Sequence, residues 1–304
     1  MKKRDKNINQ HFVPQFYLRN FTNSNKKIFV YDVHRNNHYV TSPAKECYRE
    51  YFYDINIDIF EKFVDNKEHY EELVDDKIRL LNEKVSAVLL DFINSIKNGD
   101  NHFKFPHDKR HELYNFILLS LIRTPYYRER LLYLNVPFCL KTGLSGELGD
   151  EKTLDIIHNL LLYGILSKMY NEDFKLNKLY YQIFEHLIDA IFDIRMQLEN
   201  AGKLFLLNNS DKSFICSSNP VNIVWYDNPL AQFKGLITPQ NDDKLFDVGE
   251  KLEFITIHFP ISSDVSILIF NKTFDANLTA MNQSIGRIRN WNSDIIDNLN
   301  LSTF

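Results

Sequence analysis

The chain has 304 residues, of which 44% are hydrophobic and 14% aromatic, with only nine glycines and nine prolines. This composition excludes a disordered protein and predicts a domain large enough to bury a sizeable core. The formal net charge of -4 gives no overall attraction to nucleic acid, so nucleic-acid binding would need a local basic patch.

The sequence contains neither a disulfide framework nor a recognisable targeting segment. Its three cysteines are far apart, and none belongs to a CxxC motif. The apolar stretches are too short to cross a bilayer, and no signal-peptide pattern is present. We therefore expect a soluble, cytoplasmic protein without a membrane partner.

The first 60 residues predict an anchored segment followed by a β-hairpin. Residues 11–21 read HFVPQFYLRNF, whose aromatic and apolar side chains would pack this segment onto a core. Residues 27–42 alternate apolar and polar positions on both sides of an Arg-Asn-Asn turn, which is typical of a hairpin. Residues 46–60 are aromatic but follow no regular period.

Helices are predicted throughout the middle of the chain. The first covers about 66–97, where apolar residues three or four apart form one seam: Val74, Ile78, Leu81, Val85, Val88, Phe92 and Ile96. The second covers about 107–123 and is apolar on nearly every side, so we place it centrally; Thr124-Pro125 ends or kinks it. Further helical segments are expected at 126–134, 151–170 and 176–200, and the glycine-rich 143–150 is assigned to a loop.

Short apolar strands are predicted after residue 200. Two of them, 203–209 and 212–218, flank an Asn-Ser-Asp turn; the others lie at 222–226, 235–239, 252–261 and 265–270, before a last helix at 275–298. The predicted class is α+β, with a predominantly helical core and a small, mostly antiparallel sheet built from the N-terminal hairpin and the C-terminal strands. We expect one domain over 1–304, β-rich at 9–60, helical at 66–200 and β-rich again at 203–270.

A charged stripe on the first long helix has two interpretations. Glu72, Asp76, Arg79 and Glu83 step by three or four, separately from the apolar seam. A solvated face with i,i+4 ion pairs is the ordinary reading. The alternative is that Glu72 and Glu83 point into a functional site.

Arg123 follows the most apolar helix of the chain and is expected to be partly buried. A buried guanidinium needs an acidic partner, and a glutamate from the stripe is the natural candidate if the two helices pack. The pair would be either an ordinary buried ion pair or part of a site that binds phosphate or carboxylate.

His11 is the first polar candidate in the chain. Pro14 restricts Val13 to an extended backbone, and the following aromatic residues would hold the segment rigidly. A fixed imidazole can transfer a proton, bind a metal or serve as a structural hydrogen-bond donor. Gln15 belongs to the same segment and is a candidate ligand-binding residue.

Further polar candidates occur near the predicted strands and on the last helix. Ser218 and Asn219 precede Pro220 and form either a structural turn or a loop that presents polar groups to a ligand. His258–Ser262 looks similar, and Asn282 is a weaker candidate. The acidic residues Asp54, Asp58, Asp65, Glu68 and Glu72 are able to bind a hard cation such as Mg²⁺, but so are most acidic surfaces.

The sequence resembles the bacterial domain-of-unknown-function family DUF4238. The resemblance rests on HFVPQFYLRNF, on Glu72 and Glu83, on Arg123-Thr124-Pro125, on Ser218-Asn219-Pro220-Val221 and on Phe259–Ser262. It covers about residues 9–290. One departure is Ser218, which stands where the family has an aspartate. The resemblance implies no activity, although members of the family look like accessory or defence-associated bacterial proteins.

We expect these polar groups to converge at a cleft between the helices and the sheet. A histidine, two carboxylates and an arginine suit phosphoester chemistry: His11 would transfer a proton, Glu72 and Glu83 would hold Mg²⁺ or Mn²⁺ or orient water, and Arg123 would stabilise charge. The expected function is thus a nuclease or phosphodiesterase that acts as a toxin or anti-phage effector. The alternatives are a non-catalytic binding module with a buried structural network, and a nucleotide-binding enzyme.

Overall fold

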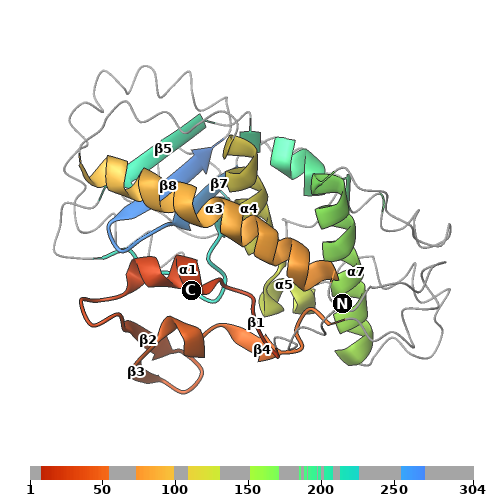
Figure 1. Ribbon diagram of the computed structural model, residues 1–304, viewed down its shortest axis with the longest axis horizontal. Helices are drawn as coiled ribbons and strands as arrows, with labels where there is room; N and C mark the ends of the chain where they lie inside the picture. Colours follow the sequence, from red (N-terminus) through yellow and green to blue (C-terminus); the bar gives the residue numbers. More distant parts are fainter. Residues whose placement is uncertain are drawn as a thin grey trace, which may run out of the picture.

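The computed structural model describes residues 8–54, 73–98, 109–130, 151–170, most of 185–199, 202–207, 213–225 and 255–270. It confirms the α+β class. Helix α3 crosses the molecule, with α7 on one side of it and strands β5, β7 and β8 on the other (Figure 1). The predicted segments 143–150, 235–239 and 275–298 lie outside the described residues, as do Glu72 and Asn282.

The N-terminal region contains short elements and a hairpin. Strand β1 (Asn9–His11) pairs with β4 (Tyr48–Glu50), and β2 (Ile28–Asp32) pairs with β3 (Asn37–Thr41). Between β1 and β2 lie helix α1 (Gln15–Leu18) and the 3-10 turn η1 (Arg19–Phe21); a second turn, η2 (Pro43–Lys45), precedes β4. The hairpin is therefore confirmed, whereas the region 46–60, expected to be irregular, contributes β4.

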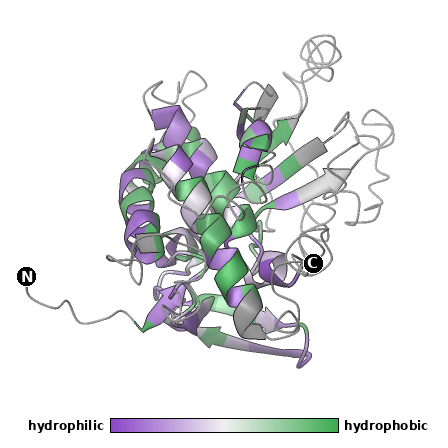
Figure 2. Ribbon diagram, turned by 90° about the vertical axis from the view of Figure 1, so that its right-hand side faces the viewer, coloured by the Kyte–Doolittle hydropathy of each residue, from purple (hydrophilic) through white to green (hydrophobic). Residues whose placement is uncertain are grey.

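The helices follow the predicted apolar patterns. Helix α3 (Leu73–Lys97) buries the predicted seam and packs against α4 (Arg110–Ile122) and α7 (Glu151–Met169). In α4 nearly every residue from Leu113 onward is buried, as its unbroken apolar sequence requires. Hydrophobic residues accordingly dominate the central helices (Figure 2).

Thr124-Pro125 ends one helix and begins the next. The backbone N–H of Arg123 still donates to Leu119, which closes α4, and α5 (Pro125–Arg130) begins with the proline. The hydroxyl of Thr124 accepts the N–H of Tyr127 at 3.3 Å, so this threonine caps α5.

The C-terminal strands form a four-stranded antiparallel sheet in the order β5-β8-β7-β6. Its members are β5 (Gly202–Leu207), β6 (Asn222–Trp225), β7 (Ile255–Pro260) and β8 (Val265–Phe270). One face packs on the helices through Ile257, Phe259, Ile267 and Ile269, which belong to the main hydrophobic core.

Two predictions about the sheet are wrong. The predicted strand 212–218 is not a strand over its described residues 213–218, and β5 pairs with β8 rather than with this segment. The reason is that Phe214 donates its N–H to Ser263, and Ser217 and Asn219 form a local turn. Among the described strands, the N-terminal hairpin also does not join the C-terminal sheet, because β2 and β3 are paired with each other in a separate two-stranded sheet.

Tyr17 attaches the N-terminal segment to the C-terminal sheet. Its fully buried ring stacks on Phe259 with 5.3 Å between ring centroids, and its hydroxyl donates to the carbonyl of Pro260. Burial raises the pKa of this phenol well above 10.0, so it stays protonated and is a hydrogen-bond donor. The predicted anchoring role of HFVPQFYLRNF is thus confirmed.

Candidate functional site

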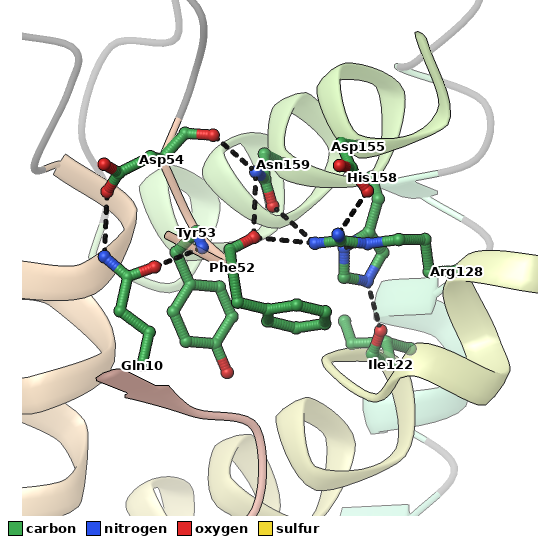
Figure 3. Close-up of polar contacts among 9 residues, drawn as sticks. All are labelled: Gln10, Phe52, Tyr53, Asp54, Ile122, Arg128, Asp155, His158 and Asn159. Atoms are coloured by element: carbon green, nitrogen blue, oxygen red, sulfur yellow. Dashed lines mark hydrogen bonds and ion pairs between the residues drawn. The ribbon is translucent and has the colours of Figure 1, made fainter. Parts of the chain in front are cut away.

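A buried polar network joins α5, α7 and the N-terminal region (Figure 3). Its centre is Arg128, whose guanidinium uses all three nitrogens. Nε donates to Nδ1 of His158 at 3.1 Å, one terminal nitrogen pairs with Asp155, and the other donates to the carbonyl of Phe52 at 2.7 Å and to Asn159. The guanidinium also lies 3.8 Å from the centroid of the Phe52 ring. This arginine is therefore fully engaged by the protein itself.

His158 is fully buried, and its surroundings define its protonation state. Nδ1 accepts the Arg128 N–H, so the proton of the neutral ring is on Nε2, which donates to the carbonyl of Ile122 at 2.8 Å. Burial first, and then the Arg128 charge, lower the pKa of His158 well below 6.5. The imidazole is thus a neutral structural group at neutral pH.

The same network fixes the chain on both sides of the β1–β4 pair. Asn159 donates to the carbonyls of Phe52 at 3.2 Å and of Asp54 at 3.0 Å. Gln10 donates to the carboxylate of Asp54 at 2.8 Å and accepts the N–H of Tyr53. These contacts join residues about 40 to 107 positions apart, so they hold the N-terminal region on the helices.

Sequence reasoning missed Arg128, His158 and Asn159. The only local signal is polarity in an apolar context: His158 and Asn159 interrupt an otherwise apolar run in α7, and both are fully buried. Such residues need partners, but their identity depends on which helices meet. The sequence pattern alone does not give that information.

Arg123 is fully buried, as expected, but its partners are different. Its guanidinium donates to Asn82 and to Ser120, each at 3.3 Å, and lies over the Phe116 ring; the Nε atom has no partner. These hydrogen-bond partners, the ones found among the described residues, are neutral. Burial lowers the pKa of Arg123 to about 10, so it keeps its charge at neutral pH.

The expected pair between Glu83 and Arg123 is not formed. Glu83 is 60% exposed and binds Arg79 at 2.8 Å, while Arg79 also binds Asp76. The described part of the charged stripe is therefore a solvated face. Asn82 faces α4 instead because it directly follows Leu81 of the seam, whereas Glu83 is a further 100° around the helix.

His11 lies at the end of β1, half-buried, beside the Tyr48 ring at 5.4 Å between centroids. Burial lowers the pKa of His11 below 6.5, and hydrogen bonding with the backbone of Ala44 and Asn9 acts in the opposite direction. Its Nε2 atom is enclosed and has no hydrogen-bond partner among the residues that the structure describes. Among the residues proposed from the sequence, His11 therefore keeps a ring nitrogen that is free to accept a hydrogen bond.

The remaining candidates are at separate places. Gln15 is at the start of α1 and accepts a weak bond from Arg19 at 3.5 Å. Ser218 is exposed next to the turn in which the Ser217 hydroxyl accepts the N–H of Asn219 at 3.0 Å. The side-chain oxygen of Asn219 is buried without a partner. The structure thus gives a turn with one unused amide oxygen at this motif.

A second group of unpaired polar atoms lies on the far face of the C-terminal sheet. His258 is directly opposite Asn222, and Ser266 is opposite Pro260, so these side chains share the face that points away from the main core. Both ring nitrogens of His258, the amide nitrogen of Asn222 and the hydroxyl of Ser266 are buried without partners. Burial lowers the pKa of His258 to about 3.

The described residues do not bring together a set of metal ligands. No three His, Cys, Asp or Glu side chains among them lie close enough to hold an ion. Asp54 is bonded to Gln10, and Glu72 is outside the described residues. We therefore derive no chemical step from a metal. None of the described helices combines the length and the apolar composition that a membrane span requires.

Comparison with protein families identifies the class of this chain. The model of the family described as "Protein of unknown function (DUF4238)" matches residues 9–302, which is nearly the whole sequence. The protein belongs to this family, as its motifs predicted. Searches of curated proteins and of solved structures gave no match.

Proposed function

We propose that the protein cleaves phosphoester bonds in nucleic acid, with His11 as the group that transfers a proton. The observation that carries this proposal is the unused Nε2 of His11. A neutral imidazole is suited to accept a proton from an attacking hydroxyl group or water, which forms the new P–O bond while the P–O bond to the leaving oxygen breaks and that oxygen takes up a proton from solvent. Burial lowers the pKa of His11, so the neutral, basic form predominates at neutral pH.

Exposed cations beside His11 are suited to bind the phosphate. Lys45 and Arg49 are exposed and directly follow Ala44 and Tyr48, two of the residues that lie beside the imidazole. Phosphate oxygens would bind these cations while the proton moves to His11. Because Nε2 is enclosed, a substrate would reach it only after a local movement, such as one of the exposed Tyr48 ring, whose centroid lies 5.4 Å from that of the imidazole.

A cleavage assay tests this proposal. Labelled single-stranded RNA, single-stranded DNA and duplex DNA would be incubated with the purified protein, in Mg²⁺ or Mn²⁺ and in EDTA. His11→Ala should lower the cleavage rate at least about 100-fold, as expected for the loss of a general base. His111→Ala is the matched control, since this histidine lies at the exposed start of α4.

The assay has clear contrary outcomes. Equal rates for wild type and His11→Ala, with both proteins folded by circular dichroism, would remove His11 from the mechanism. If the wild type cleaves none of these substrates, the proposal that the protein is a nuclease is rejected. A bacterial toxin or anti-phage effector is the biological role that suits such an activity, and expression of the wild type should then arrest bacterial growth while His11→Ala does not.

A non-catalytic binding module is the second candidate, and it is favoured by a different observation. The polar groups of Arg128 and His158 are hydrogen-bonded within the protein itself. Arg123 is fully buried, and Glu83 is paired at the surface. If His11→Ala changes neither cleavage nor binding but lowers the melting temperature, the N-terminal motif has the structural role that this candidate requires.

A further inference from the structure

An exposed aromatic face distinguishes the N-terminal hairpin from the rest of the described surface. Phe29 is 69% exposed, Tyr31 48% and Val40 60%. Phe29 is opposite Val40 and Tyr31 is opposite His38, so these four side chains share one face of the β2–β3 ribbon. The hairpin lies at the edge of the molecule, apart from the four-stranded sheet (Figure 1).

The aromatic rings on this face are held in fixed positions. Phe29 stacks on His38 with 5.5 Å between centroids and 25° between planes. The Tyr31 hydroxyl donates to Asn36 at 2.7 Å, and Asn36 adopts a left-handed backbone conformation (φ 48°) in the turn. A partner that stacks on these rings would therefore not have to order them first.

The segment that contains the hairpin is also locally basic in an acidic protein, while the hairpin itself (28–41) holds one cation, Arg35, which pairs with Asp32 at 3.6 Å. Between residues 24 and 49 there are five Lys or Arg residues and two acidic residues, whereas the whole chain has 36 and 40. All five cations are exposed: Lys26, Lys27, Arg35, Lys45 and Arg49. This is the local basic patch that nucleic-acid binding requires in a chain of net negative charge.

We infer that the exposed face of the β2–β3 hairpin binds single-stranded nucleic acid. Unpaired bases stack on aromatic rings irrespective of sequence, and neighbouring cations bind the phosphates, whereas the bases of a duplex are already stacked inside it. The inference rests on the nucleic-acid partner of the proposed function but not on its catalytic step. It adds the substrate class, and it places binding in the same N-terminal region as His11.

Fluorescence anisotropy with labelled oligo(dT), oligo(U) and a DNA duplex tests the inference. The measurements would be made in EDTA, with wild type and with His11→Ala to prevent cleavage. Phe29→Ala and Tyr31→Ala should each weaken binding of single strands roughly tenfold, because one stacked base is lost. Leu90→Ala, which removes a 51% exposed side chain on α3, should leave binding unchanged. Arg35→Ala should reduce the salt dependence of binding.

The outcomes separate this inference from the proposed cleavage. Tight single-strand binding that depends on Phe29 and Tyr31 supports the inference even if nothing is cleaved. Absence of single-strand binding, or binding unaffected by both substitutions, overturns it even if cleavage occurs. If the protein binds no nucleic acid but is a dimer that Phe29→Ala dissociates in light scattering, the face is a protein interface and the inference is wrong.

Discussion

Two fully buried histidines distinguish the helical junction from the C-terminal sheet. At the junction, both ring nitrogens of His158 are hydrogen-bonded, one to Arg128 and one to Ile122. On the sheet, neither nitrogen of His258 has a partner within the part of the chain that the structure describes, and its neighbours Asn222 and Ser266 also carry unpaired atoms. His158 and His258 are therefore equally buried but differ completely in their hydrogen bonding.

The difference teaches that burial alone does not tell how much a polar residue stabilises the fold. A buried polar group that makes all its hydrogen bonds contributes to stability. Removing one residue of such a network leaves the polar groups of its neighbours without hydrogen-bond partners. A buried group without bonds destabilises the native state, unless water or a small molecule supplies the missing partners. Substitutions at the two sites should therefore have opposite effects.

The largest effect is expected at Arg128. Arg128→Met leaves Nδ1 of His158, the Phe52 carbonyl and Asn159 with fewer partners, so we expect the free energy of unfolding to fall by about 3 kcal/mol. Urea denaturation would measure it. Arg79→Met is the matched control, because Arg79 makes only exposed pairs, and it should cost less than about 1 kcal/mol. Equal losses for the two variants would contradict the central role of the network.

The two histidines allow a direct comparison. His158→Leu should lower the free energy of unfolding by roughly 2 kcal/mol, because it leaves an arginine N–H and the Ile122 carbonyl unpaired. His258→Leu should be neutral or stabilising, since it removes two unpaired nitrogens. A marked loss of stability in His258→Leu would instead show that a bound molecule or solvent satisfies this ring.

Acid stability gives an independent test. Burial lowers the pKa of His258 from 6.5 to about 3, so below pH 6.5 the unfolded state takes up a proton that the native state does not. His258 therefore gives no pH dependence above pH 6.5 and makes the native state progressively less stable as the pH falls from 6.5 toward 3. His258→Leu should reduce the slope of unfolding free energy against pH in this range by about 1.4 kcal/mol per pH unit. Identical slopes for variant and wild type would refute the claim that His258 stays neutral in the native state over this pH range.

The smallest effect is expected at Glu83. Glu83→Gln weakens an exposed pair with Arg79, so the free energy of unfolding should change by less than about 0.5 kcal/mol. A double-mutant cycle between Glu83 and Arg123 should give coupling near zero, since the two side chains do not pair. Coupling above about 1 kcal/mol would restore the ion pair that the sequence predicted.

Among the described parts of the fold, the sequence best predicted the elements whose apolar residues recur at a regular spacing. Helices α3, α4 and α7 and the β2–β3 hairpin follow from apolar spacing, which reports the face that each element buries. The strand predicted at 212–218 was wrong, because Phe214 packs on His258 of β7 and donates its N–H to Ser263 between β7 and β8 without forming a ladder. Pairing between distant strands, such as β5 with β8, is decided by tertiary contacts that a local pattern does not contain.

The candidate site was predictable only at the level of residue type. Burial of Arg123 followed from the apolar helix that precedes it. Its hydrogen-bond partner, however, depends on the rotation of α3 about its axis, because a shift of one position would replace Asn82 by Glu83 opposite the guanidinium. The Arg128–His158 contact depends on the packing of α5 against α7 and has no sequence signature. His11 was found because a histidine beside a proline and several aromatic residues is locally unusual.

The contact between Tyr17 and Pro260 has a consequence for synthesis of the chain. The two residues are 243 positions apart, so at an elongation rate of about 5 to 20 residues per second Tyr17 waits roughly 12 to 50 s for its docking strand to be made. During that time Tyr17 has neither Phe259 nor Pro260 to pack against. The motif that fastens the finished protein is therefore, on the ribosome, an exposed aromatic segment of the kind that chaperones protect.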